Sequence, residues 1–126
     1  MDWKAARSDP KNSEVKHLIN TEDFLDKVLA LLSKDIQKKL PALRETVVNS
    51  GRRALRTLAA DLERWNFMLA AGTITSKEYE WLVQGRVALI QIQSLKASGL
   101  ALARLDEFRN SLVRAIVGAA VASIGI

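Results

Sequence analysis

The chain contains no cysteine, one histidine and two prolines among its 126 residues. Without cysteine it can form neither a disulfide nor a thiolate metal site. This composition fits a reducing compartment, and we expect a cytoplasmic protein, with membrane-peripheral binding as an alternative. His17 has no second ligand or base near it in the sequence. We therefore expect a surface histidine, no metal, no cofactor and no small-molecule substrate.

Long hydrophobic runs are also absent. The longest stretches without a charged residue are residues 65–76 and 115–126, twelve residues each. Spanning a bilayer takes about twenty apolar residues, so we predict no transmembrane helix. The first residues hold no apolar stretch of the kind found in a secretory signal.

The composition that is present favours helices. Six glycines and two prolines leave few helix breakers, although 48% of the residues are hydrophobic. We predict an all-α domain over residues 21–126, a three- or four-helix bundle with long antiparallel helices, preceded by a polar N-terminal arm over residues 1–20. The hydrophobic content implies more apolar surface than a small bundle can bury, which favours association with another chain.

Capping signals mark the first helix. Thr21 is a good N-cap residue, and Glu22 and Asp23 follow in the first turn, where negative charge is favourable. Apolar residues then recur at helical spacing up to Leu40. Pro41 should bend or end this helix.

The second helix is predicted over residues 42–71 and carries the clearest periodicity. From Gly51 onward its apolar positions alternate in steps of four and three, which is a heptad pattern. We call these positions the heptad seam: Val48, Gly51, Leu55, Leu58, Leu62, Trp65 and Leu69. Gly72 follows where a C-cap glycine belongs.

The turn after Gly72 carries a capping box, in which Thr75 and Glu78 bond each other's backbone amides, with Ile74 as a staple residue before it. Its spacing also matches the second half of a calcium-binding loop. The first three ligand positions of such a loop would be Phe67, Leu69 and Ala71, which offer no side-chain oxygen, so we expect no calcium site. The arrangement from Leu69 to Tyr79 resembles the helix hairpin of SHOCT-type short C-terminal domains, which implies a turn between two helices.

The third helix starts at Thr75 and should continue to about Leu95. Its apolar residues cover most of the circumference, so we expect it to be buried on several sides. The stretch around Ser98 and Gly99 leaves two alternatives open, a break between two helices or one long helix.

The last segment turns wholly apolar after Arg114. It can pack inside the monomer, form an oligomer interface or insert shallowly into a membrane. Its small residues favour close helix packing over insertion. The predicted interface residues are Val87, Ile92, Leu95, Leu102, Leu105, Phe108, Leu112 and Ile116.

Arginines form the one charged pattern of note. Arg52, Arg53 and Arg56 have no acidic residue three or four positions away, and together with Arg64 they are candidates for binding an anion. A solvated, solubilising outer face is the interpretation that the sequence favours for them. Asp61 with Arg64 and Glu107 with Arg104 have the spacing of ion pairs on a helix surface.

No phosphate-binding loop and no paired nucleophile and base occur in the sequence, so we expect no enzyme. The predicted function is a non-enzymatic interaction or assembly module, acting as a homo-oligomer or as a subunit of a larger complex. One alternative is a peripheral protein on an anionic membrane, through the C-terminal segment and the arginines. Another is a helical protein associated with nucleic acid, which the lack of stacking aromatics beside the arginines disfavours.

Overall fold

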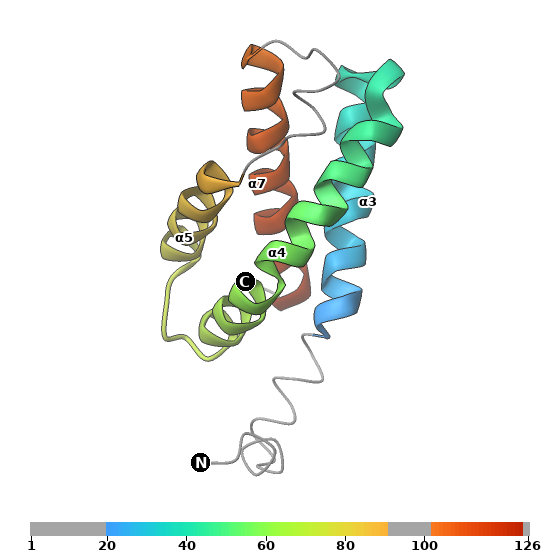
Figure 1. Ribbon diagram of the computed structural model, residues 1–126. Helices are drawn as coiled ribbons and strands as arrows, with labels where there is room; N and C mark the ends of the chain where they lie inside the picture. The colour runs from blue at the N-terminus through green and yellow to red at the C-terminus, as the bar shows by residue number, and fades with distance from the viewer. Residues whose placement is uncertain (1–19, 91–101, 125–126) are drawn as a thin grey trace.

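The computed structural model describes residues 20–90 and 102–124, which form four α-helices and one short 3-10 helix, with no strand among them (Figure 1). In chain order these are α3 (Thr21–Lys39), η1 (Pro41–Leu43), α4 (Arg44–Ala70), α5 (Ser76–Leu89) and α7 (Leu102–Ile124). The predicted polar arm, apart from Asn20, lies outside the described residues. The all-α prediction is confirmed for the described part of the chain.

Helix α3 begins one residue earlier than predicted. Its N-cap is Asn20, whose side-chain oxygen accepts a hydrogen bond from the Asp23 amide at 3.1 Å. Thr21, the predicted cap, is the first helical residue. Both residue types cap helices well, and starting at Asn20 places Phe24 in the first full turn, where it is buried.

The end of α3 matches its sequence signals. Lys38 and Lys39 lie in the last turn, and Leu40 leaves the helical conformation because it precedes Pro41. Pro41 then opens the 3-10 turn η1, which reverses the chain into α4.

Helix α4 packs against the other three α-helices and crosses in front of α3 and α7 in Figure 1. The heptad seam is confirmed as its buried face, apart from Val48, which is half-buried. The predicted start was two residues early, because residues 42 and 43 belong to η1. Gly51 is buried at the closest approach of α4 to α3, where an added Cβ would lie 2.5 Å from a Leu32 methyl group.

The turn between α4 and α5 confirms the predicted caps. Gly72 has φ +77°, the left-handed conformation. The amide of Gly72 donates to the Leu69 carbonyl at 3.1 Å and that of Thr73 donates to the Met68 carbonyl at 2.8 Å. This pair of bonds is a Schellman motif, which satisfies carbonyls that the helix end would otherwise leave unpaired.

Helix α5 ends earlier than predicted. Leu89 is its last residue, and Ile90 is extended, with ψ 128°. The alternative of one long helix from Thr75 into the last segment is wrong, because α5 ends at Leu89. The predicted break point itself, around Ser98 and Gly99, lies outside the described residues.

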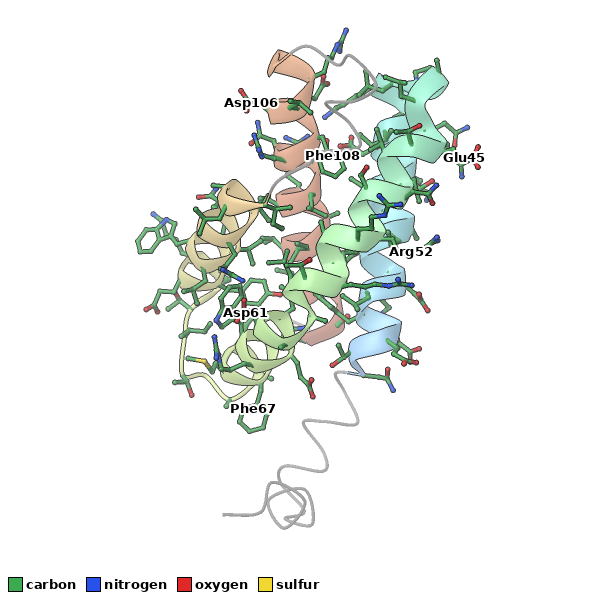
Figure 2. The ribbon with its side chains drawn as sticks, in the orientation of Figure 1. Glu45, Arg52, Asp61, Phe67, Asp106 and Phe108 are labelled. Atoms are coloured by element: carbon green, nitrogen blue, oxygen red, sulfur yellow. The ribbon has the colours of Figure 1, made fainter. Side chains whose placement is uncertain are left out.

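One contiguous apolar core joins all four α-helices. Helix α7 lies between α3 and α5 and packs on both. One face of α7 is buried, and it consists of Leu105, Phe108, Leu112, Ile116 and Ala119. Figure 2 shows Phe108 pointing from α7 toward the helices that face it. The core therefore includes apolar residues of α7 that were predicted to contact a second chain.

Polar contacts at the surface join α3 to α7. The Asp35 carboxylate accepts from Lys39 at 3.3 Å and from Arg114 of α7 at 3.4 Å. A hydrogen bond from Ser111 holds the pKa of Asp35 below its ordinary value of 3.8, although partial burial opposes this. The hydrogen bond and charge of Lys39 and a hydrogen bond from Arg114 lower this pKa further. These groups are exposed enough for solvent to screen them, so they align the helices more than they stabilise them.

Candidate interaction surfaces

The predicted interface residues lie mostly inside the single chain. Five of them are buried by the chain's own helices, with exposures of 4% or less: Val87, Leu105, Phe108, Leu112 and Ile116. Ile92 and Leu95 lie outside the described residues, and Leu102 opens α7 without a described side chain. In this fold these five side chains present no surface to a second copy, because neighbouring helices already cover them.

The C-terminal run packs on the other helices as far as it is described. Ala115, Ile116, Ala119 and Ala120 are buried, and Val117 and Ile124 are half-buried against the core. Its small residues allow this close approach, as at Gly118, where an added Cβ would be 3.8 Å from Leu31 of α3. Of the three alternatives for this run, packing inside the monomer is the one observed.

The expectation that the third helix is buried on several sides is wrong. Tyr79, Val83 and Val87 form its single buried face. The opposite side carries Trp81, Leu82 and Leu89, which are 59%, 37% and 72% exposed. A helix is covered only where neighbours lie, and among the described helices α5 packs against α4 and α7.

These exposed side chains form one surface, which we call the α5 outer face: Trp81, Leu82, Gly85 and Leu89. At 100° per residue the four positions fall within about a third of the helix circumference. Gly85 lies between the larger residues, and an added Cβ there would meet nothing within 4 Å. Of the five large apolar side chains that are exposed in the described residues, three lie on this face.

Charged groups border the α5 outer face without crossing it. The Lys77 ammonium lies 5.7 Å from the centre of the Trp81 ring, which is cation–π distance. Arg86 donates to Asp61 of α4 at 2.9 Å on the far edge of α5. The middle of the face is therefore apolar, and each charge at its border already has a partner.

A cleft of about 430 Å³ lies between α5 and α7. Gln84 and Ala88 line one wall, and Asp106 and Arg109 line the other. Arg109 donates to the Ile90 carbonyl at 3.3 Å, which satisfies the end of α5, and lies 3.7 Å from Asp106. Its Nε is buried without a hydrogen-bond partner in the described part of the structure.

The four candidate anion-binding residues divide into two groups. Arg64 donates to Asp61 at 3.0 Å, as its spacing predicted, and Arg104 pairs with Glu107 in the same way. Arg52, Arg53 and Arg56 are exposed on the outward side of α4, and no hydrogen bond or ion pair joins their guanidinium groups to another described residue. Figure 2 shows Arg52 at one edge of α4 and Asp61 at the other, nearer α5.

The turn that resembles half of a calcium loop uses its acidic residue as a cap. Glu78 accepts a hydrogen bond from the Thr75 amide at 3.0 Å, and the Thr75 hydroxyl accepts from the Glu78 amide at 3.1 Å. The capping box is therefore confirmed. Within residues 20–90 and 102–124, no three histidine, cysteine or acidic side chains gather as metal ligands would. No helix in those ranges is long and apolar enough to span a bilayer.

A buried polar pair was missed by the sequence analysis. The Tyr79 hydroxyl donates to the Asn66 side-chain oxygen at 2.6 Å, and both residues are at most 1% exposed. Burial raises the pKa of the Tyr79 phenol well above its ordinary value of 10.0. One signal could have revealed it: Asn66 lies six residues before Gly72 and Tyr79 seven after it, and a hairpin brings such positions together.

Comparisons with protein-family models, with curated proteins and with solved structures found no match to this chain. The likeness to a SHOCT-type hairpin thus remains a resemblance of one turn. The candidate sites of function in the described residues are therefore two exposed surfaces, the α5 outer face and the unpaired arginines of α4.

Proposed function

We propose that this chain is a non-enzymatic assembly module, a four-helix bundle with antiparallel neighbours that binds a second copy of itself through the α5 outer face. The observation that carries the proposal is the contrast within α5. One side closes the core, and the opposite side leaves Trp81 and Leu89 more than half exposed. A contiguous apolar surface of this kind is typical of protein contact sites.

A second copy is a suitable occupant because the face is complementary to itself. In an antiparallel α5 pair, a large side chain of one copy can lie against Gly85 of the other, where no atom stands within 4 Å of an added Cβ. Antiparallel helices also place opposite dipole ends side by side. Lys77 and Arg86 at the border of the face already have partners within the chain, so pairing of two α5 helices does not bury them without a partner.

The size of the face sets the expected strength. A helix of 14 residues is only about 21 Å long. One such pair lies at or below the low end of specific interfaces, which bury about 1,200 Å² in total. We therefore expect association at micromolar or higher concentration, strengthened where several copies assemble.

The test is molar mass by light scattering and sedimentation equilibrium over a range of protein concentrations. The wild-type mass should rise toward a multiple of 14.0 kDa. Leu89→Asp should remain monomeric, because burying an unpaired charge costs about 3–5 kcal/mol. Leu89 is 72% exposed, so the variant should keep its fold.

Phe67→Asp is the matched control, since Phe67 is 42% exposed on α4 and lies outside the α5 outer face. It should associate like the wild type. A wild-type protein that stays monomeric at the highest concentration, or equal effects of the two substitutions, would overturn the proposal.

A further inference from the structure

The unpartnered arginines of α4 form a second surface, which we call the arginine cluster: Arg52, Arg53 and Arg56. Six of the nine arginines in the described residues have partners, which are Arg44, Arg64, Arg86, Arg104, Arg109 and Arg114. The three without a partner among the described residues are neighbours on one helix. Their lack of a side-chain partner is thus a local feature of α4 and not a general property of the arginines in the described residues.

The spacing of the cluster brings its charges together. Arg52 and Arg56 are four residues apart, and Arg53 and Arg56 are three apart, so both pairs are neighbours on the helix surface. Like charges at these spacings destabilise a helix slightly. An anion bound between them offsets this repulsion and can accept several charge-assisted hydrogen bonds at once.

We propose that the arginine cluster binds the phosphate groups of anionic phospholipids at a membrane surface. The cluster stands on the outward side of α4, with all three residues exposed. A small free anion would there remain in contact with bulk water, which weakens its attraction to the guanidinium groups. A lipid surface presents many phosphates at once, so no enclosing walls are needed.

The acidic residues beside the cluster favour lipid over nucleic acid. Glu45 and Glu63, both exposed, lie seven residues before Arg52 and seven after Arg56, on the same side of α4. Phosphates of a duplex are fixed in rows, so a duplex lying along α4 also meets these carboxylates. Lipids diffuse in the bilayer plane and can gather beneath three arginines alone. Phe67, 42% exposed, returns to this side of the helix eleven residues after Arg56 and offers the bilayer an apolar contact.

The test is co-sedimentation of the full chain with vesicles of equimolar phosphatidylglycerol and phosphatidylcholine, against vesicles of phosphatidylcholine alone. The wild type should bind the anionic vesicles selectively and lose binding as salt rises. A triple variant with Arg52→Gln, Arg53→Gln and Arg56→Gln should bind about a hundredfold more weakly, since each arginine contributes to attraction at the surface. Replacing all three with lysine keeps the charge and should preserve binding to within severalfold.

The matched control replaces Lys27, Lys34 and Lys38 of α3 with glutamine, which removes the same number of exposed positive charges elsewhere. It should bind nearly as well as the wild type. Equal losses in the two glutamine variants would show that net charge and not the cluster drives binding, and would overturn the proposal. Failure of the wild type to bind, competition by inorganic phosphate at millimolar concentration, or tighter binding to duplex DNA than to vesicles would overturn it as well. None of these outcomes depends on self-association through α5.

Discussion

The hydroxyl of Tyr79 donates to the side-chain oxygen of Asn66 at 2.6 Å inside the core, joining the first turn of α5 to the last turns of α4. The Asn66 amide nitrogen is buried with no partner in the described structure. Asn66 therefore depends on Tyr79 for the one side-chain hydrogen bond observed there. We therefore expect the stability of the hairpin to be sensitive to the loss of this hydrogen bond.

Tyr79→Phe should lower the free energy of unfolding by about 1–3 kcal/mol, because it leaves the Asn66 oxygen buried and unpaired. Urea denaturation followed by circular dichroism measures this. The double variant Tyr79→Phe, Asn66→Leu should recover much of the loss, since removing both polar partners can be nearly neutral. A single variant as stable as the wild type would contradict the buried bond.

Alkaline titration provides an independent check, because Tyr79 is the chain's one tyrosine. Burial raises the folded-state pKa above the ordinary 10.0. The folded protein thus holds a proton that the unfolded chain releases, so this stabilising contribution is full below about pH 10 and declines as pH rises further. Tyrosinate absorbance should therefore appear only with unfolding. Wild-type stability should fall faster above pH 10 than that of Tyr79→Phe, and a phenolate forming in the folded protein near pH 10 would refute this.

The turn between α4 and α5 should respond to both of its caps. Thr75→Ala should cost about 1 kcal/mol, because the Glu78 amide loses its acceptor, whereas Thr75→Ser should cost little. Gly72→Ala should cost about 1–2 kcal/mol, the penalty for a left-handed residue with a Cβ, and Gly72→Asn should cost less. Thermal and urea unfolding compare the four variants. Gly72→Ala matching the wild type would show that the left-handed turn is not required.

Local signals predicted the parts of the fold that depend on near neighbours. The heptad seam, the left-handed Gly72 and the Thr75 capping box each involve residues a few positions apart, so the sequence contains all the groups concerned. The N-cap of α3 was misplaced by one residue because Asn20 and Thr21 are both good caps. The hydrogen bond from the Asp23 amide to the Asn20 side chain shows which of the two is the cap.

The burial of each helix face depended on packing that the sequence does not show. Counting apolar residues around α5 predicted burial on several sides, yet Trp81 and Leu89 are 59% and 72% exposed. The same counting placed Phe108 and Ile116 in an interface, although α7 lies where α3 and α5 can both cover it. The exposed faces could therefore be identified only from the structure, which shows which helices pack against one another.

The last prediction uses two helical glycines in opposite surroundings. A Cβ at Gly51 would lie 2.5 Å from a methyl carbon of Leu32, and Leu32 is fully buried, so its side chain has little room to move. A Cβ at Gly85 meets nothing within 4 Å. Alanine favours a helix over glycine by about 1 kcal/mol, whereas overpacking a core costs about 1–3 kcal/mol.

Gly85→Ala should therefore stabilise the protein by about 0.5–1 kcal/mol, and Gly51→Ala should be less stable than Gly85→Ala by about 1–3 kcal/mol, the cost of overpacking. Urea unfolding at low protein concentration, where self-association does not contribute, gives both values. Combining Gly51→Ala with Leu32→Val should relieve the crowding, so the double variant should be more stable than the two single changes predict by addition. If Gly51→Ala stabilises the protein as much as Gly85→Ala, α3 and α4 are farther apart at Gly51 than its contact with Leu32 indicates. The heptad seam of α4 would then not need a glycine at position 51 for its packing against α3.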